Sequence, residues 1–294
     1  MAPHAAIPTS EFLIPDAEFP ARPPSRPGAG YVRAVATTAG GTSISHVRAE
    51  SPLRLFTPRV SPMAAWVVTA TLGGGLVGGD DIRLSVDVED DARVLLTTQA
   101  STKVYRSALG ARQHLDAHVA DGALLVAWPD PIVGFAGSTF DQRQRFHLAE
   151  HATLLAVDWV VSGRRAYGEH WAFDRYVSRF EVERAGRAVF YDHLRLSQTD
   201  GPVAERMRGF SAYAVAVVTG PMVGALADEI LADVSGRPAD RRHDPIVSAA
   251  PLARTGGVVL RMAGTSVERL GATLREILRP IVPLVGDDPW ARRW

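Results

Sequence analysis

The sequence predicts a mainly β (α+β) fold: a β-helix-like or solenoid stack of β-hairpins, followed by two C-terminal α-helices. Residues 31–196 consist of short runs of alternating or β-branched residues, separated by Gly, Asp and Pro turns. One strand–turn–strand pattern recurs within this region at nearly constant spacing. After Gly201 the pattern changes, and two stretches with helical start and stop signals appear.

The 294-residue chain has an ordinary globular composition, with 32 basic and 32 acidic residues and a net charge of zero. Nucleic-acid-binding proteins normally carry a basic excess, so this balance argues against that class. The absence of cysteine excludes disulfides, thiolate metal sites and cysteine nucleophiles. The sequence shows no secretory signal pattern, and its two long uncharged stretches are broken by Gly or Pro. We therefore expect a cytoplasmic protein that binds no membrane.

Residues 1–29 are rich in Pro and Ala and show little periodicity. They are predicted to form a disordered tail, or a segment that becomes ordered on a partner. Residues 30–294 are predicted to form a single domain.

A glycine-rich segment at residues 72–81 lies between predicted strands at 66–72 and 82–88. Its glycines have the spacing of a dinucleotide-binding motif, but that motif requires a helix after the glycines and a strand follows here. Asp80 and Asp81 stand where a phosphate-binding loop needs Lys and Ser/Thr. We interpret the loop as a place where another group approaches the backbone closely, with Gly74, Gly75, Gly78 and Gly79 as candidates.

The recurring unit is an alternating strand, an acidic or Gly turn, an alanine and a second apolar strand. Its three clear copies are marked by Ala92, Ala123 and Ala152, which recur at nearly equal intervals along the chain, and a looser fourth copy contains Ala185. Equal spacing suggests stacked layers, because one hairpin cannot bury its apolar face alone. An ordinary sandwich of hairpins is the alternative.

The C-terminal part is expected to begin with a strand at residues 210–219. Pro221 then opens a helix at 223–231, and residues 237–251 are polar and predicted to be mobile. A strand follows at 258–262. Thr265 and Ser266 cap a second helix at 267–278, with Pro280 after it.

Each clear copy of the unit is followed by a loop with more polar groups than a turn requires, at residues 97–107, 128–135 and 158–169. In a stack these loops lie at one end and form a common functional edge. Hydroxyl-rich turns that satisfy only their own backbone are the alternative. The first loop supplies the candidates Thr98, Ser101, Lys103, Tyr105 and Arg106.

His114, Asp116 and His118 alternate along one predicted strand, so all three project from the same face. This trio could hold a borderline metal ion, and a solvated strand face is the alternative. His147 and His151 flank a turn and are expected to be exposed.

Four carboxylates, Asp80, Asp81, Asp158 and Glu169, lie at loop edges. They could form an acid–base pair, or they could be salt-bridge partners of nearby arginines. A serine-hydrolase nucleophile motif is missing from the sequence.

Several motifs resemble the UreD/UreH family of urease accessory proteins. The two most specific are the glycine segment 73–80 and the segment 96–107, which contains Leu-Thr-Thr-Gln-Ala-Ser-Thr-Lys. Further similarity covers Pro129–Ile132, the strand 140–146, Ser162-Gly163-Arg164 with Glu169 and Trp171, and the C-terminal arginines. The segments 1–30 and 237–251 depart from the family pattern, and the Pro-Asp-Pro loop resembles only some members.

The resemblance implies a non-enzymatic scaffold for urease maturation with a β-helix-like body. Such proteins bind apo-urease and the accessory protein UreF, which recruits the GTPase UreG, and the accessory complex can dimerise. Nickel(II) in transit is implied to pass through an internal tunnel, with no tightly bound cofactor. Carboxylates exchange metal ions faster than thiolates, so we expect Asp80, Asp158 and Glu169 to be transient nickel ligands.

The polar residues of the first loop then form a supporting wall beside this route. The C-terminal helices and the edge containing Gly201, Arg208 and Phe210 are expected to contact UreF. A β-helical carbohydrate-active enzyme that uses the loop carboxylates is the rival interpretation, although aromatic residues make up only 7% of the chain.

Overall fold

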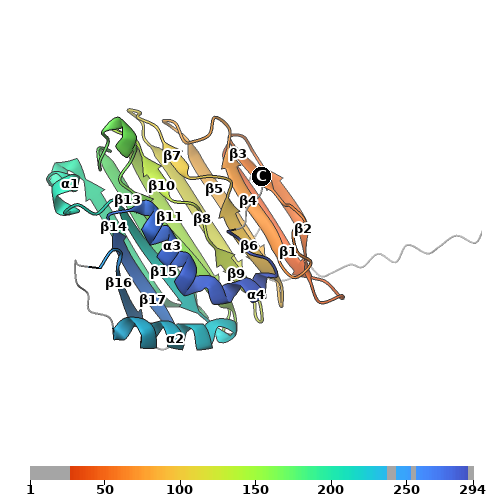
Figure 1. Cartoon of the computed structure of the whole chain (residues 1–294). Coiled ribbons are helices and arrows are strands. Elements are labelled where there is room, and N and C mark those ends of the chain that lie inside the picture. The colour runs from red at the N-terminus through yellow and green to blue at the C-terminus, as the bar shows by residue number, and fades with distance from the viewer. Residues whose placement is uncertain (1–26, 237–242, 253–255, 291–294) are drawn as a thin grey trace, which may run out of the picture.

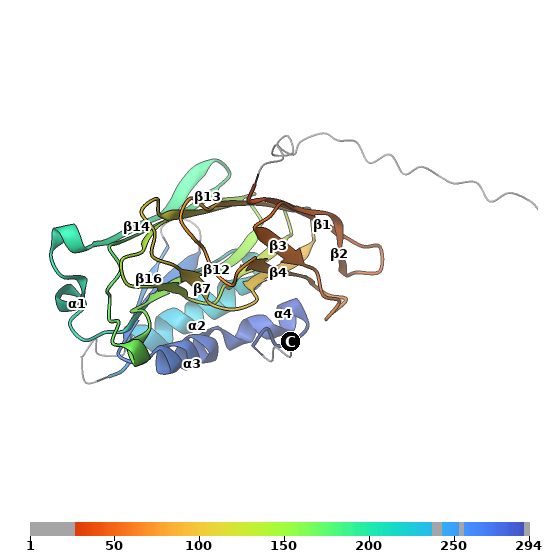
Figure 2. The ribbon, with the colours of Figure 1, turned by 90° about the horizontal axis from the view of Figure 1, so that it is seen from above.

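The described part of the chain forms three layers: two facing β-sheets, with helices on the far side of one of them (Figures 1 and 2). In this computed structural model, residues 27–236, 243–252 and 256–290 are described. The predicted N-terminal tail thus lies almost entirely outside the described residues, as do residues 292–294. No helix in the described ranges is long and apolar enough to cross a membrane.

The sheet without helices, called the outer sheet, has seven strands in the order β14-β13-β11-β8-β5-β1-β2. Strands β1, β5, β8, β11 and β13 run parallel, and an antiparallel strand flanks them on each side. The bounds are β1 (Ala29–Ala36), β2 (Thr42–Ala49), β5 (Asp81–Val88), β8 (Ala111–Val119), β11 (Thr139–Leu148), β13 (Arg175–Arg184) and β14 (Arg187–Ser197).

The other sheet, called the middle sheet, has the order β16-β17-β15-β12-β9-β6-β4-β3; the short strand β10 also pairs with β12, and the short strand β7 pairs with β10. Its strands β4, β6, β9 and β12 run parallel. The bounds are β3 (Leu53–Phe56), β4 (Ala65–Thr71), β6 (Arg93–Thr98), β7 (Thr102–Val104), β9 (Leu124–Ala127), β10 (Ile132–Gly134), β12 (Thr153–Val161), β15 (Ala212–Thr219), β16 (Ile246–Pro251) and β17 (Gly257–Gly264).

The predicted repeat is confirmed as an in-register stack. Ala92, Ala123 and Ala152 are each 0% exposed at the inside of successive turns. The amide of Leu124 donates to the Ala92 carbonyl at 2.9 Å, and the amide of Thr153 donates to the Ala123 carbonyl at 2.8 Å. Each turn is therefore hydrogen-bonded to the next, and only a small side chain fits inside the stacked turns.

The units are not hairpins, however. In each clear copy the first strand lies in the outer sheet and the second in the middle sheet, as β5–β6, β8–β9 and β11–β12. Their strands face each other across the core instead of pairing, so each unit is a β-arch. Only the looser fourth copy is a hairpin: β13 and β14 pair antiparallel within the outer sheet. Its turn has positive φ at Ala185 and Gly186, which is typical of a tight two-residue hairpin turn.

The prediction of a mainly β fold with two C-terminal helices is confirmed, whereas the predicted β-helix-like or solenoid architecture is not shown. Both sheets stay open, because β14 and β2 end the outer sheet and β16 and β3 end the middle sheet. The antiparallel strands at these ends cannot continue a parallel stack.

Helices α2 (Gly224–Ser235) and α3 (Val267–Leu278) cover the middle sheet, and α1 (Val203–Arg206) and α4 (Val282–Val285) are single turns. Buried Ile230 and Leu274 pack with strand residues in one apolar cluster. As predicted, the Ser266 side chain caps α3 by accepting from the Arg269 amide at 3.2 Å. Residues 246–251, predicted to be mobile, instead form β16, because β17 offers an antiparallel partner edge.

Arg184 closes one end of the space between the sheets. It is only 7% exposed, and its Nη1 donates to the carbonyls of Ala149, Glu150 and Ala152 at 3.1, 2.8 and 2.9 Å. We expect Arg184→Leu to lower the free energy of unfolding by about 3 kcal/mol, because buried carbonyl oxygens lose a charged donor. Urea denaturation measures this, with exposed Arg187→Leu as the matched control. Equal stability of the two variants would contradict this account of Arg184.

Candidate functional site

A polar zone interrupts the apolar core between the two sheets. Along β11 the inward side chains are Phe140, Gln142, Gln144 and Phe146 in alternation. Phe140 belongs to one apolar cluster and Phe146 to another, so the two glutamines lie between the clusters. Burying amides in a core is costly unless they have partners, so a zone of this kind indicates a functional demand.

The facing strand of the middle sheet repeats this order. Along β12, Ala156 belongs to one cluster and Val160 to the other, with Asp158 between them. Asp158 therefore faces Gln142 across the core. The Gln142 amide donates to Asp158 Oδ1 at 2.8 Å, and the Ser178 hydroxyl donates to Asp158 Oδ2 at 2.5 Å.

Burial raises the pKa of Asp158, and the hydrogen bonds from Ser178 and Gln142 only partly oppose this effect. The side chain keeps some accessible surface because it faces an internal cavity. Within the described residues, the buried Gln144 Nε2 makes no hydrogen bond to protein. A buried polar atom of this kind is normally satisfied by water or an ion.

The cavity has a volume of about 130 Å³ and is enclosed by both sheets. Its deep wall includes Gln142, Gln144 and Asp158, and its lining reaches the exposed residues Gln99 and Ala100. It therefore extends from a surface loop to the buried carboxylate. This volume holds several water molecules.

Four of the predicted functional residues line this cavity: Gly74, Gly75, Thr98 and Ser101. Thr98 is also tied to the next loop, because its hydroxyl accepts from the Asp130 amide at 2.7 Å. The other predicted residues lie outside the lining: Lys103 is in β7, and Tyr105, Arg106, Gly78 and Gly79 are on the adjoining loops. Lys103 and Arg106 are exposed, and the Tyr105 ring contacts Phe135 edge-on at 5.1 Å between centroids.

The glycine loop is held against the loop after β6, as its composition suggested. The Leu76 amide donates to the Lys103 carbonyl at 2.7 Å. A Cβ atom on Gly75 would lie 2.6 Å from Tyr105 Cε2, and one on Gly78 would lie 1.5 Å from Ser107 Oγ. The close approach that these glycines permit is thus between two segments of this chain.

The structure does not bring the three predicted nickel ligands together. Only Asp158 lines the cavity. Asp80 closes its own loop, since the Val77 amide donates to Asp80 Oδ2 at 2.8 Å. Glu169 pairs with Arg164, which lowers the pKa of Glu169, and the guanidinium of Arg164 lies over the Phe135 ring. That Asp80 and Glu169 bind nickel transiently stays a prediction.

The predicted partner edge lies around α1. Gly201 and Arg208 have positive φ angles of 103° and 49°, and Arg208 is exposed. The Phe210 carbonyl accepts from the indole nitrogen of Trp171 at 2.7 Å. That Gly201, Arg208 and Phe210 contact a partner stays a prediction.

Sequence reasoning missed Gln142, Gln144 and Ser178. A usable signal was present, because the segment 139–148 alternates strictly and its glutamines are in phase with inward-facing Phe140 and Phe146. An amide in the apolar phase of a strand marks a polar position in the core.

Comparison with known proteins identifies relatives along nearly the whole chain. The family described as UreD urease accessory protein matches residues 28–294. A urease accessory protein UreD of Sorangium cellulosum is 50% identical, covering 87% of this chain and 81% of the relative. The corresponding protein of Anaeromyxobacter is 45% identical, covering 91% and 90%. A urease accessory protein D of Oryza sativa is 32% identical, covering 89% and 94%.

The raised pKa of Asp158 predicts how stability depends on pH. The folded chain holds this proton to higher pH than the unfolded chain, whose Asp has an ordinary value near 3.8. The free energy of unfolding therefore falls as pH rises from about 4 towards the folded pKa. The side chain in Asp158→Asn cannot ionise, so we expect the free energy of unfolding of this variant to fall less over the same pH range.

Urea unfolding at about pH 4 and about pH 8 measures the effect, with Asp90→Asn in an exposed turn as the control. An unchanged pH dependence in Asp158→Asn would contradict the buried position of this carboxylate.

Proposed function

The chain belongs to the UreD family of urease accessory proteins, and from this premise we propose that it is a scaffold that delivers nickel to urease. Membership supports a role in urease maturation and makes the chain an accessory protein, not an enzyme. The rival interpretation as a carbohydrate-active enzyme is therefore wrong. The finer parts of the proposal are the nickel route and the partners.

Nickel(II), the cargo, passes between the sheets through the cavity. The observation that carries this proposal is the carboxylate of Asp158, on the wall of a mostly apolar cavity that reaches the surface. Asp130 is a second carboxylate in the lining. Two carboxylates with amide and hydroxyl neighbours bind a borderline cation weakly, and weak binding permits transfer. Cysteine thiolates would hold the ion more tightly, and this chain has none.

The wall of the route near the surface is formed by Thr98 and Ser101, with the glycine loop opposite. Exposed Lys103 in β7 and exposed Arg106 in the loop after it lie beside this wall, where positive charge disfavours a stationary cation. The entrance thus lets an ion pass without holding it. Tyr105 supports this loop through its contact with Phe135.

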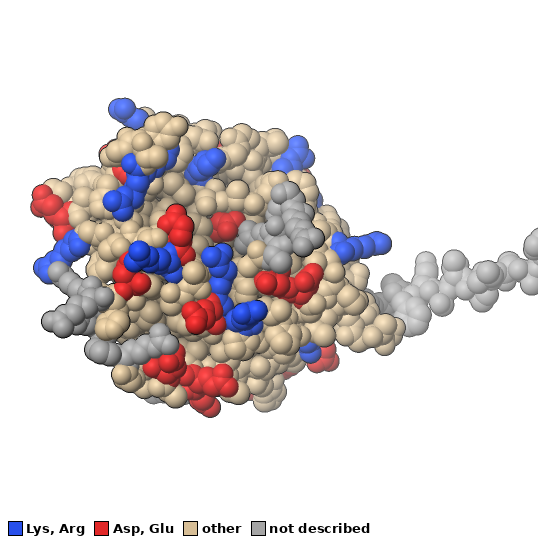
Figure 3. All heavy atoms as spheres, viewed as in Figure 1, with Lys and Arg blue, Asp and Glu red and all other residues tan. Residues whose placement is uncertain are grey.

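The partners are apo-urease and UreF, with UreG joining through UreF. The helical face supports one such contact: charges of both signs are mixed over it, and acidic side chains gather at α2 (Figure 3). A groove between α2 and α3 is lined by apolar Ile230 and Ile277 with acidic Glu229, Asp233 and Glu276. This groove suits an apolar segment that carries basic residues. The edge at Gly201, Arg208 and Phe210 remains a second candidate for UreF.

Co-purification tests the partner proposal. We expect the tagged chain to capture urease apoprotein together with a second accessory subunit from cells that express the urease genes. Glu229→Lys with Glu276→Lys, at two exposed positions of the groove, should abolish capture of one of these partners, because reversed charge opposes a segment that carries basic residues. Unchanged capture of both proteins would contradict the groove as a contact surface.

Obstruction of the cavity entrance tests the route. We expect Ala100→Trp to lower urease activity severalfold in nickel-limited cells while leaving partner capture intact, because the indole narrows the opening. Ala188→Trp, at an exposed position on the outer-sheet hairpin, is the matched control. If both variants activate urease like the wild type, nickel does not pass this entrance.

A further inference from the structure

The exposed face of the outer sheet carries a second set of candidate ligands, which is separate from the cavity. Four parallel strands place Asp87, His118, His147 and Glu183 in one row, as direct register partners from β5 to β13. Asp116 precedes His118 by two positions and so lies on the same face. The sequence-predicted trio differs, because it contained His114 and not His147.

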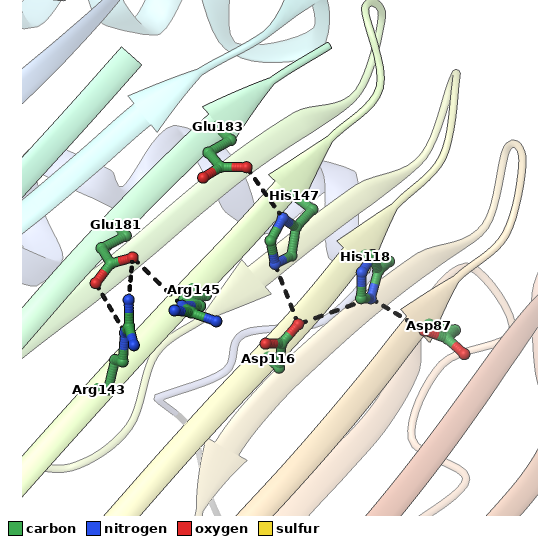
Figure 4. A network of polar contacts seen from close by, with 8 residues as sticks. All are labelled: Asp87, Asp116, His118, Arg143, Arg145, His147, Glu181 and Glu183. Carbon is green, nitrogen blue, oxygen red and sulfur yellow. Dashed lines mark hydrogen bonds and ion pairs between the residues drawn. The ribbon is translucent and has the colours of Figure 1, made fainter. Parts of the chain in front are cut away.

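Asp116, His118 and His147 each offer one ligand atom, and these atoms all lie within 4.8 Å of one another, so rotation of one imidazole ring brings all three to a common ion. His147 Nε2 is 3.2 Å from Asp116 Oδ1, and His118 Nδ1 is 3.9 Å from the same oxygen (Figure 4). The two imidazole rings are stacked, with centroids 4.6 Å apart. All three side chains are half-buried.

These separations approach those of a metal site. With metal–ligand bonds of about 2.1 Å, neighbouring ligand atoms lie about 3.0–3.4 Å apart in octahedral or tetrahedral geometry. The 3.2 Å separation already meets this range, whereas the 3.9 Å separation and the distance between the two histidine nitrogens, which is within 4.8 Å, require a side-chain adjustment. His118 Nδ1 is buried and makes no hydrogen bond within the described chain, so no hydrogen bond must break for it to ligate.

The surroundings complete the arrangement. His147 Nδ1 lies 3.4 Å from Glu183 Oε2, so a carboxylate stands behind the histidine, as is usual for metal-ligating imidazoles. Asp87 lies 3.5 Å from His118 and is held by the Tyr31 hydroxyl at 2.7 Å. The nearby cation Arg145 is paired with Glu181 and also lies beside Asp116, whose pKa it helps to lower.

His114, by contrast, turns to a different carboxylate: its Nε2 lies 3.7 Å from Asp81 Oδ1. An alternating trio on one strand spans three register rows, whereas His118 and His147 are direct neighbours on adjacent strands. The ligand atoms that lie closest together therefore come from two adjacent strands, β8 and β11.

We propose that Asp116, His118 and His147 form a surface site for a borderline divalent cation of the first transition row, such as Ni²⁺, Co²⁺ or Zn²⁺. Imidazole nitrogen with one carboxylate is a donor set suited to these ions. The site lies on the opposite side of the outer sheet from the cavity and does not depend on the proposed nickel route. An ordinary cross-strand ladder of histidine–carboxylate ion pairs is the competing explanation.

Titration of the purified full-length chain with Co²⁺ alone tests the proposal, because the visible spectrum of cobalt reports its ligands. We expect one cobalt site in the wild type. His118→Gln and His147→Gln should each weaken it at least about tenfold, and Glu183→Gln should weaken it about 10–100-fold by releasing His147. His114→Gln and His193→Gln should leave it unchanged.

Thermal unfolding of each variant identifies any loss caused by misfolding. A measurement on the wild type is independent of folding defects: the NMR signals of the His118 and His147 imidazoles should broaden on cobalt addition, and that of His193 should not. A cobalt spectrum that survives His147→Gln, or broadening at His114 in place of His147, would overturn the proposed site.

Discussion

The structure depends on the hydrogen-bonded register between successive β-arches. One turn donates its backbone amide to the carbonyl of the buried alanine in the turn before, first at Ala92 and then at Ala123. This contact sets a nearly constant offset along the chain between equivalent positions of successive arches. Because the strands are parallel, the same offset holds along their whole length, for the side chains that face the core and for those that face solvent.

Inside, the register aligns polar positions that lie far apart in the chain. Gln113 and Gln142 are direct partners in the outer sheet, and Ser178 continues their row. Asp158 meets this row from the middle sheet. A core that contained only apolar residues here would be more stable, since each buried polar group must recover the hydration that it loses. A carboxylate and a cavity at this place are consistent with the conduit that we propose.

Much of the fold could be predicted from the sequence because its signals are local. The spacing of Ala92, Ala123 and Ala152 predicted the stack, and Ser266 with the apolar period after it predicted α3. The choice between hairpin and arch could not be made this way, because both give two apolar strands around a turn. The separation of Asp80 and Glu169 from Asp158 was also beyond reach, since it depends on how long loops fold back.

Other features were present in the sequence but were not recognised. His118 and His147 are separated along the chain by the same interval as Ala123 and Ala152, so the repeat itself pairs them. Strand alternation alone favoured His114, because alternation shows only what shares a face along one strand. Cross-strand neighbours require the register as well. The same limit applies to the glutamines of β11. Alternation shows that they share a face with Phe140 and Phe146, but it does not show that a carboxylate lies opposite them.

We propose that the polar zone between the sheets is a water-accessible passage that opens to the surface near Ala100. Since the chain contains no cysteine, a single introduced cysteine reports its own surroundings. Reaction with a small charged thiol reagent is to be measured for Gln144→Cys in the deep wall and for Val217→Cys in the apolar core. The account predicts that cysteine at 144 reacts far faster than cysteine at 217, and that Ala100→Trp slows it. If the cysteine at 144 is as inert as that at 217, no such passage exists.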